Sequence, residues 1–268
     1  MTSTESIHSS VLNYRKENGR QYHGYKDGNW DSNETLDLQH HMFLLTFGAK
    51  LFTAPIPKDQ QLHRVLDVGT GTGIWAMDFG EDLLPTHCFA NRYTADEYPQ
   101  TQVIGVDLSP TQPSYVPPNL KFEIDDIEEP WTFTTRNLNP GGWIEAADIC
   151  VPHRSDDGTL PLNSTTYKWG ALCIESAQNL GRPIDSAKVV WKWPTNRWPK
   201  DREMKELGMW YHENVTRNLY GLSVAHFTRG LGWSLAELEL FLVDIRKEIS
   251  DTKIHTWVPM QISLQRTR

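Results

Sequence analysis

The stretch R-V-L-D-V-G-T-G-T-G-I-W, residues 64–75, decides the fold. Residues 65–68 form a short apolar run typical of a buried strand in a parallel sheet, and residues 74–84 carry apolar side chains at helical spacing. The glycine loop G-T-G-T-G, residues 69–73, separates the two. Glycines at a strand-to-helix turn accept positive φ and lack a Cβ atom, so a ligand can lie directly against the backbone amides. The stretch therefore predicts a cofactor-binding loop between a strand and a helix.

The spacing of the glycines limits which cofactor this loop can bind. A dinucleotide-binding loop, G-x-G-x-x-G, would need its third glycine at position 74, where the chain has Ile74. A P-loop would need a lysine after the glycines, and none is present there. What remains is an acid, Asp67, two residues before the first glycine, and a second apolar run, residues 103–107, that ends in Asp107. The alternative interpretation is a tight turn that binds nothing.

Charge and cysteine usage exclude several classes of protein. The formal net charge is −8 and no run is rich in Lys or Arg, so we expect no direct nucleic-acid partner. The three cysteines, Cys88, Cys150 and Cys173, lie far apart without a C-x-x-C pair, which is typical of thiols in a reducing compartment. No apolar run approaches the ~18 residues of a membrane span, and the first residues show no signal-peptide pattern. We expect an intracellular protein, in the cytoplasm or the nucleus, without a membrane partner.

Two adjacent histidines lie in a helix that is predicted to begin at about Glu34. Neighbouring residues of a helix point about 100° apart, so His40 and His41 cannot easily share one metal ion. No H-x-x-x-H pattern or cysteine partner accompanies them. We therefore expect no metal site, and we interpret the pair as packing or cofactor-side residues.

Many ordered segments of the chain match one family. The first half contains Y-R-x-E-N-G-R-x-Y-H-G-Y, L-D-L-Q-H-H, the glycine-loop stretch, V-I-G-V-D-L-S-P-x-Q-P and F-E-I-D-D-x-E-E-P-W. The second half adds N-x-x-P-G-G-W-I-E, L-G-R-P, W-P-K-D and F-T-R-G-L-G-W-S. In this order the segments resemble the fungal LaeA-like methyltransferases over most of the chain. The resemblance implies an α/β fold with a Rossmann-like class I methyltransferase sheet, helices on both of its faces and a helical C-terminal cap. It also implies S-adenosylmethionine as cofactor and a role in or around secondary metabolism.

The resemblance further assigns domains and cofactor-binding residues. It implies an N-terminal arm at residues 1–33, a core that binds S-adenosylmethionine at 34–150, and a helical, substrate-side region at 151–268 that returns to the sheet. Asp67 would lie at the methionine end of the cofactor, the glycines beneath it, and Asp107 would accept hydrogen bonds from both ribose hydroxyls. The full implied set is Asp67, Gly69, Thr70, Gly71, Gly73, Asp107, Leu108, Asp125, Asp126 and Ile127.

Residues 120–124 are predicted to form the next strand, which leads into an acidic turn. At this end of the cofactor, the adenine end, the resemblance implies a carboxylate that accepts a hydrogen bond from N6. Asp126 is the favoured residue, and Asp125 is the close second. A solvated acidic turn is the alternative interpretation of this segment.

The chain departs from the family in four places. Too few residues lie between 127 and 143 for both a crossover and an apolar strand, so the usual fourth strand, which sits beside the first, is predicted to be missing. Relative to the family, residues 83–95 are interpreted as an insertion, and the helix that leads into the sixth strand is shortened between residues 186 and 191. The end of the chain after Trp257 departs from the expected last strand. Misassigned coding segments and a decayed methyltransferase-like protein are the two explanations.

Two functions stay open at this point. One is an active methyltransferase that acts on a small molecule, or on a protein. The other is a non-catalytic accessory or regulatory protein of secondary metabolism, with protein partners by analogy to the family. No catalytic residue is assigned, because His40, His41 and His153 qualify as bases only by residue type. Aromatic residues between positions 152 and 199 suit either a substrate cage or a core. Residues 236–249 are predicted to form an amphipathic surface helix that needs no functional role.

Overall fold

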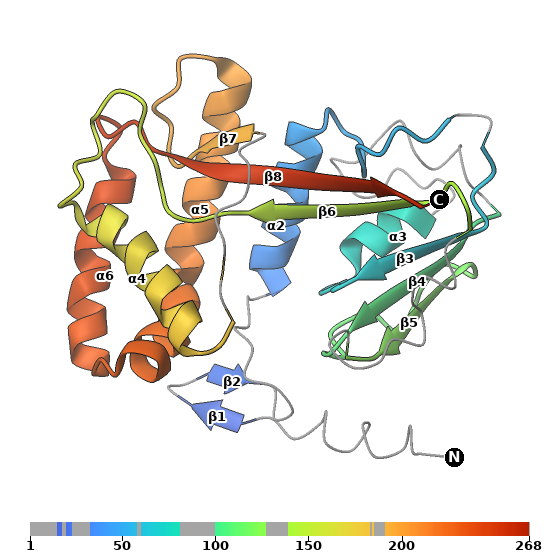
Figure 1. The fold of residues 1–268 in the computed structure, drawn as a ribbon, viewed down its shortest axis with the longest axis horizontal. Helices are drawn as coiled ribbons and strands as arrows, with labels where there is room; N and C mark the ends of the chain where they lie inside the picture. The colour runs from blue at the N-terminus through green and yellow to red at the C-terminus, as the bar shows by residue number, and fades with distance from the viewer. Residues whose placement is uncertain are drawn as a thin grey trace. The chain divides into compact units, whose positions relative to one another are not determined.

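The computed structural model describes residues 15–17, 20–22, 33–57, 60–80, 100–126, 139–182, 184 and 191–267. It shows a mixed α/β chain that divides into two compact units (Figure 1). Unit 1 comprises Leu36–Glu145 and Leu264–Arg268 with the N-terminal hairpin of β1 (Arg15–Glu17) and β2 (Arg20–Tyr22). Unit 2 comprises Asn29–Thr35 and Ala146–Ser263. Three of the boundaries fall inside elements, namely helix α2 (Asn33–Thr46), strand β6 (Trp143–Ile149) and strand β8 (Trp257–Arg266).

Unit 1 contains a parallel sheet whose three strands were all predicted from the sequence. These strands are β3 (Arg64–Val68), β4 (Gln102–Asp107) and β5 (Leu120–Ile124), in the order β3-β4-β5. In register, Val68 lies opposite Val106, and Asp107 lies opposite Ile124. The carboxyl ends of the three strands therefore meet at one edge of the sheet.

Two helices pack on one face of this sheet. Leu44 of α2 and Phe79 of α3 (Ile74–Gly80) share a buried cluster with Val103 of β4 and Leu120 of β5. Both helices were predicted, and α3 is described as far as Gly80. Among the described residues of unit 1, helices cover only this face, so the prediction of helices on both faces remains open.

Strand β3 is less buried than its apolar sequence predicts. Its central residues are half-buried, and Val68 is 40% exposed. The physical reason is that β3 has one ladder partner, β4, within the described part of the chain. An apolar run indicates burial on both sides only when strands or helices cover both of them.

Unit 2 is mainly helical. Its elements are α4 (Thr165–Asn179), α5 (Arg202–Ala225), the π-helical turn η2 (His226–Gly230) and α6 (Leu235–Ser250). Helix α4 packs against η2 and α6, and α5 packs against α6 and η2. The predicted amphipathic helix near the C-terminus is confirmed as α6. Its inward face consists of four residues that are fully or almost fully buried, Leu238, Leu242, Ile245 and Ile249.

The second sheet corrects the expectation for the end of the chain. Its order is β6-β8-β7, with β7 (Trp191–Pro194) and β8 (Trp257–Arg266) antiparallel. Residues beyond Trp257 were expected to depart from a final strand, yet they form a strand of 10 residues. The strand is stable there because Val258 and Met260 are fully buried opposite Trp193 and Trp191, respectively. Trp193 is itself fully buried and Trp169 nearly so, which favours a core role over a substrate cage for these two.

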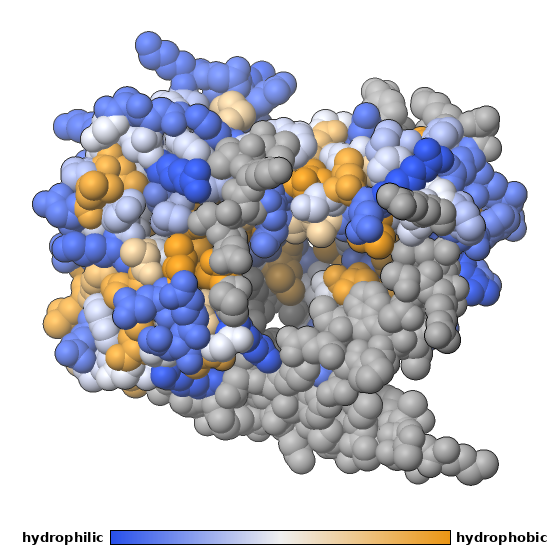
Figure 2. Space-filling view, viewed as in Figure 1, coloured by the Kyte–Doolittle hydropathy of each residue, from blue (hydrophilic) through white to orange (hydrophobic). Residues whose placement is uncertain are grey.

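Several predictions fall outside the described residues. These are most of the N-terminal arm, the insertion at 83–95, positions 127–138 of the interval for the fourth strand, and most of the shortened helix before Trp191. None of the helices in the described ranges has both the length and the apolar character to cross a membrane. Figure 2 shows hydrophilic residues over most of the visible described surface, with apolar residues in small patches.

Candidate functional site

The predicted site residues gather at the carboxyl edge of the parallel sheet. Strand β3 leads into the glycine loop, β4 ends in Asp107, and β5 leads into Asp125. Two backbone bonds join these chain ends: the Gly69 amide donates to the Val106 carbonyl at 2.8 Å, and the Asp125 amide donates to the Asp107 carbonyl at 3.2 Å. In open α/β sheets, ligands bind outside this carboxyl edge.

The three glycines of the loop have different surroundings, although each has a positive φ. A Cβ atom on Gly69 would meet nothing within 4 Å, so this side of the loop is open. A Cβ on Gly71 would lie 3.0 Å from Leu36, and a Cβ on Gly73 would lie 2.4 Å from the ring of Phe122. Gly69 therefore leaves room for a ligand, whereas Gly73 is required because an aromatic side chain fills its space.

The backbone amides of the loop differ from the expected cradle. The amides of Gly69 and Thr70 donate to the Val106 carbonyl, and the amide of Gly73 donates to the Thr70 carbonyl. The Gly71 amide donates to Oδ2 of Asp107 at 2.8 Å. Three of these donors bond to the end of β4 and the fourth bonds within the loop, so all four are used inside the protein. The site therefore offers a ligand the open side at Gly69 and the neighbouring carboxylates of Asp67 and Asp107.

Asp107 is the central acceptor of the site. Its Oδ2 accepts from Gly71, and its Oδ1 accepts from the Ser109 amide at 2.9 Å. An ionised carboxylate has about four lone-pair sites, so about two remain for a ligand. The two bonds also fix the direction in which the carboxylate points, which prepares it for a pair of neighbouring hydroxyl donors.

Asp67 lies beside the loop in a less polar environment. Its Oδ2 accepts from Oγ1 of Thr70 at 2.5 Å. Burial raises the pKa of this carboxyl, and the nearby charge of Asp107 raises it further, whereas the hydrogen bond from Thr70 and the proximity of His40 lower it. The charge on Asp67 therefore depends on its neighbours.

The acidic turn after β5 is described as far as Asp126. Asp126 is 2% exposed, and its amide donates to Oδ1 of Asp125 at 2.8 Å. A solvated turn therefore does not describe Asp126, while Asp125 is half-buried. Leu108 is half-buried beside Asp107, and Ile127 lies outside the described residues.

Two polar residues beyond Asp107 were missed as site residues. Oγ1 of Thr111 and Nε2 of Gln112 both donate to the Gly71 carbonyl, at 2.8 and 2.6 Å. Nε2 of Gln112 also donates to the Ser109 carbonyl at 2.8 Å. The segment L-S-P-x-Q-P contributed only to the family resemblance, and nothing in its local pattern indicates a contact with Gly71, which lies 41 positions from Gln112. These side chains hold the middle of the glycine loop against the end of β4.

Two of the three histidines considered as bases, His40 and His153, have polar partners within the fold. Nε2 of His40 lies 2.8 Å from Oδ2 of Asp78 in α3. His153 is fully buried in unit 2, where Nε2 lies 3.3 Å from the Tyr211 hydroxyl and the ring lies 5.6 Å from that of Trp169. His153 therefore cannot exchange protons with a bound substrate. No group of three His, Cys, Asp or Glu residues in the described ranges is arranged to hold a metal ion.

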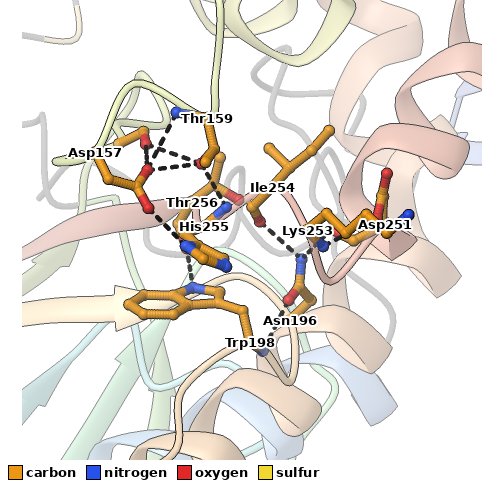
Figure 3. Close-up of polar contacts among 10 residues, drawn as sticks. Asp157, Thr159, Asn196, Trp198, Asp251, Lys253, Ile254, His255 and Thr256 are labelled. Carbon is orange, nitrogen blue, oxygen red and sulfur yellow. Dashed lines mark hydrogen bonds and ion pairs between the residues drawn. The ribbon is translucent and has the colours of Figure 1, made fainter.

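A separate polar cluster in unit 2 joins three loops (Figure 3). Asp157 accepts from the amide and hydroxyl of Thr159 and faces Nδ1 of His255 at 2.6 Å. The His255 ring stacks on Trp198 at 5.0 Å. Asn196 donates to the carbonyls of Ile249, Asp251 and Ile254 at the end of α6. Because these bonds pair the backbone carbonyls of the turn between α6 and β8, the cluster has a structural role that needs no ligand.

Known proteins place the chain in a family, although no family model matches it. It is 32% identical to "Secondary metabolism regulator LAE1" of Cochliobolus heterostrophus, over 90% of this chain and 91% of that protein. It is 30% identical to "Methyltransferase pytC" of Aspergillus terreus, over 95% and 88%. It is 27% identical to "Protein-methionine methyltransferase laeA" of Emericella nidulans, over 96% and 77%. The chain therefore belongs to the LaeA-like methyltransferases, a family of methyltransferases and regulators linked to secondary metabolism.

Proposed function

We propose that this methyltransferase takes its methyl group from S-adenosylmethionine bound at the carboxyl edge of β3, β4 and β5. The observation that carries the proposal is Asp107, an oriented carboxylate with acceptor capacity left at the end of the second strand. A ribose presents two adjacent hydroxyl donors, which suit such an acceptor. The open side of Gly69 supports the same location.

The other residues of the site fit the remaining parts of this donor. Asp67 would accept from its ammonium group, and Asp126, or Asp125, from its adenine amino group. Gly69, Thr70, Gly71 and Gly73 would form the loop beneath it, and Leu108 and Ile127 complete the proposed cofactor-binding set. When bound, S-adenosylmethionine supplies an electrophilic methyl group, and the protein's task is to orient the two reactants and exclude water.

The fold supports a class I methyltransferase core, which we propose for residues 34–150. The order β5-β4-β3 corresponds to the 3-2-1 half of a Rossmann-like sheet. The predicted absence of the fourth strand stays a proposal, and the exposure of Val68 in β3 supports it. We also propose that residues 151–268 form the region of the protein that binds the methyl acceptor. An intracellular location, in the cytoplasm or the nucleus, stays a prediction.

The acceptor is proposed by chemical class. A small molecule of secondary metabolism agrees with the relative named methyltransferase pytC, and a protein agrees with the relative named protein-methionine methyltransferase laeA. The alternative is a methyltransferase-like accessory protein without catalysis. Transfer of a labelled methyl group separates the two, because an accessory protein binds the donor without consuming it.

The test of the site is equilibrium binding of S-adenosylmethionine by calorimetry. Asp107→Asn removes the charge and places an amide donor against the Gly71 or Ser109 amide. Hydrogen bonds to charged groups are worth about 1.5–3 kcal/mol, so affinity should fall about 10- to 100-fold. Asp244→Asn, the same change on an exposed residue of α6, is the matched control. Equal affinity in wild type and Asp107→Asn would place the donor elsewhere.

A further inference from the structure

Helix α2 contacts the glycine loop and α3 through three side chains on neighbouring turns. Leu36 lies 3.0 Å from the position that a Cβ of Gly71 would take. Oδ1 of Asp37 accepts from Oγ1 of Thr72 at 2.8 Å. One turn later, Nε2 of His40 pairs with Oδ2 of Asp78 at 2.8 Å. Residues three and four apart share one face of a helix, so all three contacts belong to the same face of α2.

The three contacts differ in how well they can hold the helix. The bond between Asp37 and Thr72 is exposed, where a polar contact adds little. The side chains of His40 and Asp78 are only 9% and 17% exposed. A bond with a charged partner is stronger when water is excluded from it. Of these three contacts, the His40–Asp78 pair is therefore the strongest polar link between α2 and α3.

Fixing α2 determines which side of the glycine loop a ligand can reach. Leu36 covers Gly71, while nothing lies within 4 Å of the Cβ position of Gly69. Building on the proposed function, we propose that His40 is a positioning residue of the methyl-donor site. It anchors α2 to α3 through Asp78, so that Leu36 and Asp37 close one side of the glycine loop. The methyl donor then binds at the other side, at Gly69.

Calorimetric binding of S-adenosylmethionine to the full chain tests the proposal, with a thermal melt of each variant. His40→Ala should bind about tenfold more weakly, which corresponds to about 1.4 kcal/mol. His40→Gln should keep affinity within about threefold of wild type, because its amide can still donate to Asp78. His63→Ala, which removes an exposed histidine of the same unit, should bind as wild type does. Glutamine also restores much of the lost volume, so His40→Leu, which fills the space but cannot donate to Asp78, is the packing control and should bind as weakly as His40→Ala.

Each outcome decides one question. If wild type binds and His40→Ala binds equally well, or His40→Gln binds as weakly as His40→Ala, the positioning role is wrong while the donor site stands. If wild type does not bind, the proposed function itself fails. If His40→Ala does not melt cooperatively, Asp78→Ala replaces it, because this change removes the acceptor of the His40 hydrogen bond. A loss of about tenfold supports the anchor, and unchanged affinity overturns it.

Discussion

His153 makes the stability of the folded chain depend on pH in a calculable way. The imidazole is fully buried between Trp169 and Tyr211, and burial lowers its pKa from 6.5 to about 4. Between these values the unfolded chain binds more protons than the folded one, so the free energy of unfolding rises with pH. Stability from this group is complete above about pH 6.5 and is lost as the pH falls toward 4. The difference of about 2.5 pH units, at 1.36 kcal/mol each, amounts to about 3 kcal/mol.

The perturbation that isolates this effect is His153→Gln. Glutamine does not titrate, and its amide oxygen can still accept from the Tyr211 hydroxyl, which lies 3.3 Å from Nε2 of the histidine. Urea unfolding followed by circular dichroism at pH 7, 6, 5 and 4 gives the free energy of unfolding for both proteins. We expect wild type to lose about 3 kcal/mol more than His153→Gln across this range. His63→Gln, the same change at an exposed histidine, should follow wild type. Parallel curves for wild type and His153→Gln would refute a neutral, buried imidazole.

Three further changes test the packing. In α5, Gly208→Ala places a Cβ 2.1 Å from the Asn196 carbonyl oxygen. Overpacking costs about 1–3 kcal/mol and should outweigh the gain in helix propensity of about 1 kcal/mol. We therefore expect a lower midpoint of urea unfolding. Glu248→Gln removes the carboxylate that accepts from two amides at the start of α4, at 2.9 and 2.7 Å, and should cost about 1–3 kcal/mol in the same assay. Gly73→Ala combines a positive φ with a Cβ 2.4 Å from Phe122, so the melting temperature should fall; an unchanged value would mean that the ring moves freely.

Local patterns predicted the elements of unit 1 well. The apolar runs that became β4 and β5, and the helical spacing that became α2, depend on residues within a few positions of one another. The carboxyl edge of the sheet followed from the strands, and at this edge Asp107 accepts from the Gly71 amide while the Asp125 amide donates to the Asp107 carbonyl. Burial of β3 was predicted less well, because an apolar run does not reveal whether a second neighbour strand exists.

Local sequence patterns did not predict hydrogen bonds between residues that are far apart in the sequence. Nothing local indicates that His40 pairs with Asp78, that the Gly71 amide bonds to Asp107, or that Glu248 accepts from the start of α4. These bonds join residues 36 to 83 positions apart, and tertiary packing selects them. The last strand was missed for a related reason: burial beside β7 supplies the stability that its irregular sequence does not indicate.

Hydrogen exchange with and without S-adenosylmethionine tests the central claim most directly, because it shows where on the chain the donor binds. We expect slower exchange at the glycine loop, at residues 108–112 and at Asp125 and Asp126, where the account places the donor. S-adenosylhomocysteine should protect the same segments, since it keeps the ribose and the adenine. Protection confined to unit 2, or no protection at a saturating donor concentration, would contradict a methyl-donor site at the carboxyl edge of β3, β4 and β5.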